Sequence, residues 1–154
     1  DIFNFTSGGY KSMKFRNVNH DGSAAQAVGF VDTDFPLFRA ADAYLMLAEC
    51  AARGAADNAK GLAAYNAVRE RAGVPTASSI TPEDVLNERG RELLWEGHRR
   101  SDLIRFGQFT TADYLWEYKG SVKEGVAVAD YRNLFPLPPA DVNANSNLKQ
   151  NAGY

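Results

Sequence analysis

The sequence lacks most of the features that mark specialised classes of protein. It has one cysteine, Cys50, so an intrachain disulfide is impossible and the redox compartment stays open. The two histidines, His20 and His98, are far apart and belong to no HExxH or Cys/His cluster, so neither a metal site nor a cofactor is expected. The sequence also has no run of about 20 apolar residues that would predict a transmembrane helix.

A strong charge of one sign is missing as well. The 154 residues carry 17 Lys and Arg against 19 Asp and Glu, which gives a formal net charge of −2. Nucleic acid and anionic membrane surfaces select basic proteins, so neither is expected as a partner. The G-x-S-x-G and P-loop motifs are absent, and no catalytic residue is predicted. A hydrophobic content of 45% is ordinary for a globular domain.

The beginning of the chain favours a segment of a longer protein. It starts Asp-Ile-Phe, without an initiator methionine or a signal peptide. We expect residues 1–154 to form a single C-terminal segment with three stretches. These are an extended arm over residues 1–34, helical pairs over residues 35–107, and irregular loops with a C-terminal tail over residues 108–154.

The arm contains one turn signal with two interpretations. Residues 10–17 predict a strand or an extended arm, and His20-Asp21-Gly22 predicts a turn. The stretch from Asn17 to Gly22 also matches the first half of an EF-hand calcium loop. Val28, however, stands where the glutamate of the twelfth position belongs. A hairpin turn is favoured, and calcium near Asn17 and Asp21 is the alternative.

Apolar residues at helical spacing predict two helices, over residues 37–53 and 58–72. Their short linker requires antiparallel packing, and the pair spans about one tetratricopeptide unit. Thr81-Pro82-Glu83-Asp84 begins a third helix that is expected to reach residue 96. Shorter helices are predicted over residues 101–106 and 139–143, and Cys50 is expected to be an inert core thiol. The predicted fold is mainly α, with tetratricopeptide-like antiparallel helix pairs, long irregular loops and a short N-terminal extended arm.

The densest charge lies in residues 88–107, ERGRELLWEGHRRSDLIRFG. Glu88, Glu92 and Glu96 share one helical stripe and would repel one another without cations. The arginines that could meet this stripe are Arg69, Arg71, Arg91, Arg99 and Arg105. Glycoside hydrolysis needs two carboxyl groups facing each other across a cleft, roughly 5 to 9 Å apart, which one paired stripe does not provide. The stripe is therefore interpreted as structural, and an enzyme is not expected.

Tyr114, Trp116 and Tyr118 follow an i, i+2, i+4 spacing. On an extended segment their side chains would share a face. A row of flat aromatic rings suits the apolar faces of sugar rings, which makes these three residues the candidates for ligand binding. A hydrophobic clamp that holds the loop on the helices is the favoured alternative.

Five motifs resemble, in order, those of the SusD/RagB family, and of its starch-binding SusD branch in particular. They are FPLFRAADAYLMLAE at 35–49, YNAVRERAGV at 65–74, the charged run at 88–107, LFPLPPADV at 134–142 and QNAGY at 150–154. Two departures are visible. Gly90 lies inside a helix, where glycine lowers helix stability by about 1 kcal/mol relative to alanine. Ala152 replaces a proline in the terminal motif.

This resemblance implies a helical, non-enzymatic lipoprotein on the cell surface of Gram-negative bacteria. Such a protein binds glycans and delivers oligosaccharides to a TonB-dependent, SusC-like outer-membrane transporter. The implied partners are a polysaccharide or oligosaccharide, the transporter and the remaining N-terminal part of the same protein. The lipid anchor would be an upstream cysteine outside this chain. Because the family's sugar contacts generally come from upstream loops, the motifs transfer no binding residue. The alternative is a helical interaction module that docks on the transporter without its own sugar site.

Overall fold

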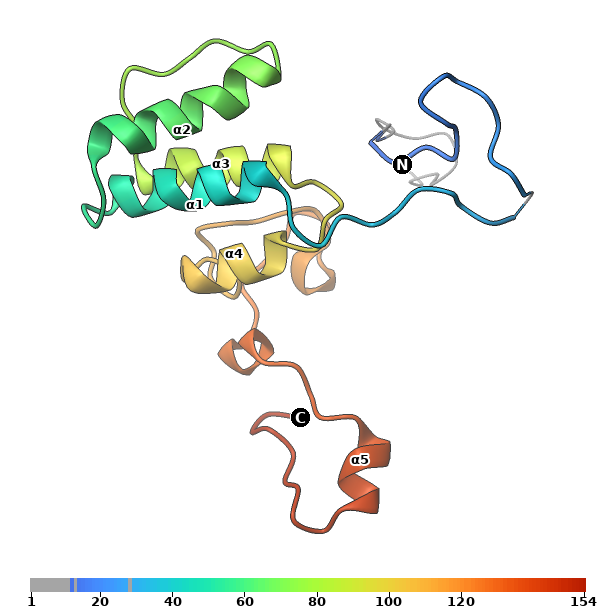
Figure 1. The fold of residues 1–154 in the computed structure, drawn as a ribbon. Helices are drawn as coiled ribbons and strands as arrows, with labels where there is room; N and C mark the ends of the chain where they lie inside the picture. The colour runs from blue at the N-terminus through green and yellow to red at the C-terminus, as the bar shows by residue number, and fades with distance from the viewer. Residues whose placement is uncertain (1–11, 13, 28) are drawn as a thin grey trace. The chain divides into compact units, whose positions relative to one another are not determined.

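The computed structural model describes residues 12, 14–27 and 29–154, which divide into two compact units, Asp1–Thr81 and Pro82–Tyr154. The α-helices are α1 (Ala40–Ala52), α2 (Asn58–Arg71), α3 (Pro82–Glu92), α4 (Arg99–Arg105) and α5 (Pro139–Ala144), with 3-10 turns η1 (Lys119–Ser121) and η2 (Asp130–Asn133) (Figure 1). In the described residues, β pairing is limited to one isolated antiparallel bridge between Val18 and Ala24. The predicted, mainly α fold class is confirmed. Among the same residues, no helix is both long and apolar enough to cross a bilayer.

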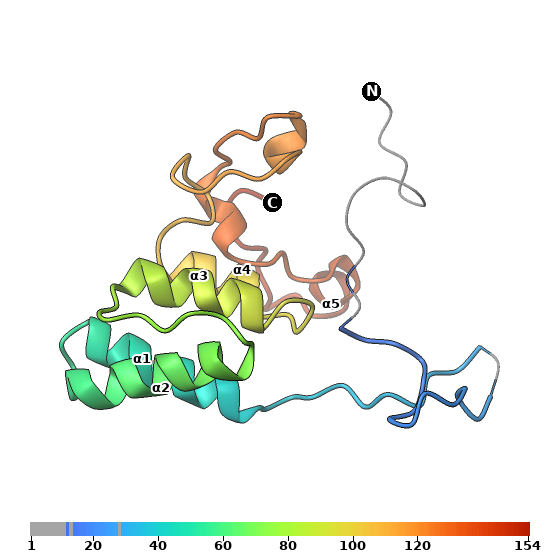
Figure 2. The same ribbon diagram turned by 90° about the horizontal axis from the view of Figure 1, so that it is seen from above.

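The first unit is built on a hairpin of α1 and α2, which lie side by side in two views (Figures 1 and 2). Asp57 begins α2, because its carboxylate accepts a hydrogen bond of 2.9 Å from the backbone N–H of Lys60. The two helices touch at Gly61, where a Cβ atom would stand 2.1 Å from Cβ of Ala51. Small residues at this contact therefore set the distance between the helices. The predicted helix pair is confirmed.

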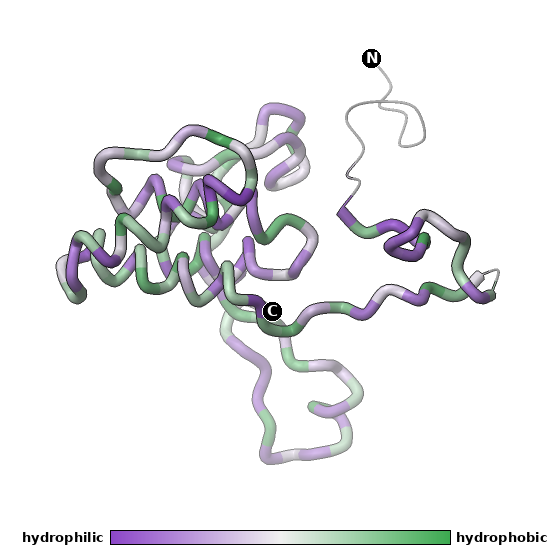
Figure 3. Tube along the Cα trace, turned by 45° about the horizontal axis from the view of Figure 1, so that its top comes forward, coloured by the Kyte–Doolittle hydropathy of each residue, from purple (hydrophilic) through white to green (hydrophobic). Residues whose placement is uncertain are grey.

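The apolar residues of α1 are not all buried. Leu45 and Ala48 are fully buried, whereas Tyr44 is 48% exposed. The helix begins at Ala40, three residues later than expected, and the apolar residues before it lie in an extended stretch (Figure 3). Cys50 is exposed, so the prediction of a core thiol was wrong. Two residues beyond Ala48 the helix has turned by about 200°, which places Cys50 off the buried stripe.

The arm contains the hairpin turn that the sequence favours. The backbone N–H of Asn19 donates to the carbonyl of Ser23, and Oδ1 of Asp21 accepts hydrogen bonds of 2.9 and 2.7 Å from the N–H and hydroxyl of Ser23. These bonds lower the pKa of the Asp21 carboxyl. The side chain of Asn17 is likewise engaged, with the backbone of Phe30 and Asp32. The side chains of Asn17 and Asp21, which the calcium interpretation would need as ligands, are thus engaged in hydrogen bonds within the protein.

Part of the arm prediction lies outside the described residues, namely residues 1–11, 13 and 28. This includes residues 10, 11 and 13 of the strand predicted over residues 10–17, and the twelfth position of the supposed calcium loop. Residues 14–17, which are described, form bends and irregular backbone.

The second unit begins with α3, which ends at Glu92 and not at residue 96. The backbone turns at Trp95, whose φ is 65°, and at Gly97, whose φ is 80°. A non-glycine residue seldom adopts this left-handed conformation, so spacing and capping rules did not predict that the helix ends here. The α4 helix begins at Arg99, two residues earlier than predicted, and α5 matches its predicted start at Pro139.

The C-terminal tail folds back along the proline-rich stretch at residues 134–137. The side-chain amide of Gln150 accepts a hydrogen bond from the N–H of Leu137 (2.8 Å) and donates one to its carbonyl (2.9 Å). The Tyr154 hydroxyl donates to the carbonyl of Leu134 at 2.8 Å, and its ring packs edge-on against Tyr131 at 4.8 Å between centroids. These contacts of Gln150 and Tyr154, here called the terminal fastening, therefore hold the C-terminal tail against residues 134–137.

Candidate ligand-binding surface

A buried ion pair joins α3 to α4. Nε of Arg89 lies 3.0 and 2.9 Å from the two carboxylate oxygens of Asp102, and both side chains are less than 5% exposed. Nη2 of Arg105 donates to the same carboxylate at 3.0 Å. Removing either partner of such a pair leaves a buried charge uncompensated. The pair therefore fixes the frame on which the neighbouring loops rest.

The predicted charge stripe is confirmed in one of its pairs. Arg91 donates to the Glu88 carboxylate at 2.7 Å. Arg99 does not pair with Glu96. Its Nη1 donates to the carbonyl of Leu86 at 2.8 Å, and its Cζ lies 4.6 Å from the centroid of the Tyr114 ring.

The position of Arg99 explains the glycine inside α3. A Cβ atom at Gly90 would lie 3.0 Å from Nη1 and 3.2 Å from Cζ of Arg99. Such contacts would require the guanidinium group to shift by a few tenths of an ångström. Glycine lowers the intrinsic stability of the helix by about 1 kcal/mol relative to alanine. The absence of a side chain at Gly90 leaves room for the guanidinium group of Arg99 against the helix backbone.

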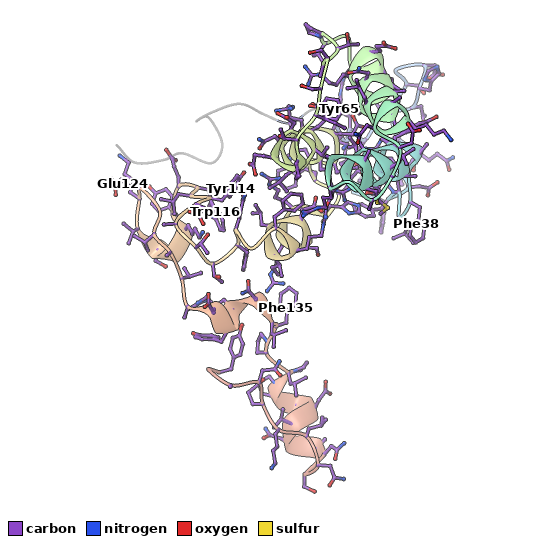
Figure 4. The ribbon with its side chains drawn as sticks, turned by 90° about the vertical axis from the view of Figure 1, so that its left-hand side faces the viewer. Phe38, Tyr65, Tyr114, Trp116, Glu124 and Phe135 are labelled. Carbon is purple, nitrogen blue, oxygen red and sulfur yellow. The ribbon has the colours of Figure 1, made fainter. Side chains whose placement is uncertain are left out.

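Beyond α4, aromatic rings and guanidinium groups form a continuous series. Trp116 stacks on Phe109 at 6.0 Å between centroids and contacts Tyr114 at 6.2 Å in a tilted arrangement. Cζ of Arg100 lies 4.9 Å from the Phe109 ring and 3.8 Å from the Phe135 ring. Figure 4 shows Tyr114 and Trp116 close together on the loop. Cation–π contacts of this kind fix planar groups in defined orientations.

Lys119 is a buried cation inside the aromatic loop. Its side chain is 2% exposed, and its Nζ donates to the carbonyls of Thr111 (2.5 Å) and Tyr114 (2.7 Å) while lying 4.8 Å from the Trp116 ring. Burial lowers the pKa of its ammonium group, and the charge of Asp113 opposes this shift. An ammonium group that donates to two carbonyls holds the aromatic segment in one conformation.

The structure thus brings together two of the three residues predicted as ligand-binding candidates. Tyr114 is half-buried between Arg99 and Trp116, and Trp116 is 40% exposed. Tyr118 is 54% exposed, and its φ of 65° ends the alternation that the i, i+2, i+4 spacing assumed. The ring contacts of Tyr114 are those of a clamp, whereas Trp116 and Tyr118 present surface to solvent.

Sequence reasoning missed a hollow beside α3 and α4. It has a volume of about 550 Å³, and its lining includes Trp95, Arg99 and Tyr114. Trp95 is 68% exposed. Trp95 was predicted to lie in a regular helix. The one available signal of a turn was Gly97, two residues after this tryptophan. No cluster of three or more His, Cys, Asp or Glu side chains suited to a metal occurs among the described residues.

Comparison with known proteins gives consistent relatives. The chain is 42% identical over 154 residues to the starch-binding protein SusD of Bacteroides thetaiotaomicron, covering 99% of this chain and 27% of that protein. The surface glycan-binding protein A of Bacteroides uniformis superimposes with a TM-score of 0.65 at 27% identity, over 77% of this chain and 27% of that one. A laminarin-binding SusD-like protein gives a TM-score of 0.61 at 28% identity, over 90% and 26% of the two chains.

The chain therefore spans about a quarter of the length of these relatives. The model of the SusD family matches residues 1–154. The helix pair, the charged run and the terminal fastening all lie within this match, and the resemblance inferred from the sequence motifs is confirmed: the chain belongs to the SusD family.

Proposed function

We propose that this chain is part of a cell-surface protein that binds a glycan and delivers oligosaccharides to a TonB-dependent, SusC-like transporter in the outer membrane. The observation that carries the proposal is the 42% identity, over 154 residues, to a protein named for starch binding. Because that relative is much longer, delivery would be an activity of a longer protein to which this chain contributes.

The second unit supports a role in binding. Trp116 and Tyr118 are exposed on a loop whose backbone is held by the buried Lys119. A binding surface that is ordered before the ligand arrives loses less conformational entropy on binding. Aromatic faces suit the C–H faces of sugar rings, and the neighbouring carbonyl and guanidinium groups suit their hydroxyls.

The carboxylates in α3, in α4 and in the turn between them support binding without catalysis. Asp102 receives two guanidinium groups, Glu88 receives Arg91, and Glu92 and Glu96 also have partners. A glycosidase needs one carboxyl group free to donate a proton and a second free to attack or to activate water. These acids are instead occupied in holding the fold.

The stretch before α1 supports the third proposed partner, the remaining N-terminal part of the same protein. Phe35 is 56% exposed, Leu37 73% and Phe38 92%. Large apolar side chains gathered in one short stretch mark a surface that another polypeptide covers. The same stretch is the observation in favour of the alternative function, an interaction module that docks on the transporter without its own sugar site. The proposed surface location and upstream lipid anchor rest on the family alone.

Affinity electrophoresis tests the proposal. The chain is run in native gels that contain starch, laminarin or other polysaccharides, beside gels without polysaccharide. Retarded mobility in at least one polysaccharide, without release of reducing sugar, is the expected result. Unchanged mobility in every gel, together with binding to the purified transporter, would favour the interaction module. Reducing sugar released by the pure chain would instead identify an enzyme.

A further inference from the structure

We propose that the hollow beside α3 and α4 is a subsite for one sugar ring, with Trp95 as its platform and Arg99 as its hydrogen-bond donor. Its lining includes Asn87, Gly90, Trp95, Arg99 and Tyr114. The inference rests on the proposed glycan-binding function, and it assigns the ligand to a place that no motif indicated.

The size of the hollow fits the proposal. Its volume of about 550 Å³ lies within the range of roughly 300 to 1,000 Å³ that is usual for small-molecule sites. Gly90 lies in its lining, and the absence of a side chain there leaves room for the guanidinium group of Arg99 at the edge of the hollow.

Trp95 has the exposure and the backbone conformation expected of a platform. Its side chain is 68% exposed, so core packing does not account for a tryptophan at this position. Its φ of 65° is a strained conformation for a residue with a bulky side chain. Strained backbone of this kind gathers at ligand-binding sites, where the surrounding structure maintains it. An indole face presented to solvent offers the flat apolar surface on which the C–H face of a sugar can stack.

Arg99 and Asn87 supply the complementary polar groups. The guanidinium group of Arg99 is held by the carbonyl of Leu86 and the ring of Tyr114, and within the described residues it has no carboxylate partner. Its remaining N–H groups are therefore oriented in advance and can donate to hydroxyl oxygens. The side-chain carbonyl of Asn87 accepts no hydrogen bond within the described residues, while its amide donates to Glu83. A sugar hydroxyl both donates and accepts, so it matches this pair.

The hollow is continuous with the aromatic loop. Tyr114 lines the hollow, and its ring lies 6.2 Å from that of Trp116, beside which it is labelled in Figure 4. Tyr114 thus connects the lining of the hollow to the exposed ring of Trp116. A linear glycan bound at Trp95 would extend towards Trp116.

The chain contains two tryptophans, which permits a direct test. Trp116→Phe leaves Trp95 as the sole indole, and Trp95→Phe leaves Trp116. Each reporter variant is titrated with maltoheptaose, a linear fragment of starch, and its fluorescence is recorded with and without acrylamide. The expected result for the Trp95 reporter is a saturable change in emission and protection from acrylamide.

Affinity measurements complete the test. Trp95→Ala should bind maltoheptaose roughly tenfold more weakly, as expected for the loss of one stacked ring. Gly90→Ala should also weaken binding because it displaces Arg99. Phe38→Ala, which removes a 92% exposed ring in the other unit, is the matched control and should bind normally. Circular dichroism verifies that each variant is folded, and Trp95→Phe should retain most of the affinity.

The two proposals fail in different ways. If the wild-type chain binds glycan while the Trp95 reporter stays unchanged at saturation and Trp95→Ala binds normally, the subsite is wrong and the proposed function stands. If the wild-type chain binds no polysaccharide of the panel and no maltoheptaose, both proposals are overturned.

Discussion

The helical hairpin of α1 and α2 and the second unit are stabilised by different kinds of contact. In the hairpin, alanine and glycine bring two helices into van der Waals contact at Ala51 and Gly61. In the second unit, cationic side chains are buried or stacked, with Arg89 on Asp102, Arg100 between two phenylalanines and Lys119 on two carbonyls. Close packing suits a scaffold, whereas polar and aromatic contacts build irregular loops that expose rings to solvent.

The largest expected effect tests the charged frame of the second unit. Arg89→Met removes the buried partner of Asp102 and should lower the free energy of unfolding by roughly 3–5 kcal/mol, because the carboxylate then stays buried with less compensation. Thermal and urea unfolding measure the change. Arg132→Met is the control, since Arg132 is exposed and its guanidinium group lies 5.5 Å from the Tyr131 ring, and it should change stability by about 1 kcal/mol or less. Equal effects of the two variants would contradict the comparison.

The second prediction concerns the buried lysine. Lys119→Met keeps the aliphatic chain but removes the donor to Thr111 and Tyr114, so we expect a loss of about 2–3 kcal/mol in urea unfolding. The exposed Lys123 provides the control, Lys123→Met, which should be close to neutral. A loss confined to Lys123→Met would show that the loop is not held from within.

Lys119 also predicts a dependence of stability on pH. Burial lowers the pKa of its ammonium group in the folded state below the ordinary value of 10.5. Between these two pKa values the unfolded chain binds more protons, so the free energy of unfolding rises with pH. Wild type should therefore become more stable relative to Lys119→Met as the pH rises across this alkaline interval. Below the interval, the difference in their free energies of unfolding should stay constant. A difference that shrinks with rising pH would contradict the assignment.

The third prediction tests close packing in the first unit. Gly61→Ala places a methyl group against Ala51 and should destabilise the chain by about 1–3 kcal/mol through overpacking. This would occur although alanine is the better helix former by about 1 kcal/mol. Lys60→Ala, at the exposed neighbouring position, is the control and should be neutral or slightly stabilising. A stabilised Gly61→Ala chain would mean that the two helices can separate freely.

The smallest effect is expected at the terminal fastening. Tyr154→Phe removes the hydroxyl that donates to the carbonyl of Leu134, and the loss should be about 1 kcal/mol or less because the site is exposed. Amide hydrogen exchange of residues 134–137 is the sensitive measurement, with faster exchange expected in the variant. Tyr118→Phe, whose hydroxyl has no hydrogen-bond partner in the described part of the chain, should leave these amides unchanged.

The same difference between the units explains which features the sequence could predict. Periodic apolar residues are local signals, so the hairpin, its linker and the start of α3 at Pro82 followed from spacing and capping rules. The left-handed backbone at Trp95 and the burial of Lys119, which donates to carbonyls of its own loop, belong to irregular backbone. Neither has a periodic signature. The hollow that depends on them was consequently missed, whereas Trp116, which belongs to a simple alternation, was found.

The most direct measurement of the central claim is NMR titration of the isotopically labelled chain with maltoheptaose, in which the two tryptophan indole N–H signals report on the second unit separately. The account predicts saturable shifts of both indole signals and of amides at residues 87–118, while amides of α1 and α2 stay in place. Unshifted indole signals at saturating ligand, or shifts confined to α1 and α2, would contradict it.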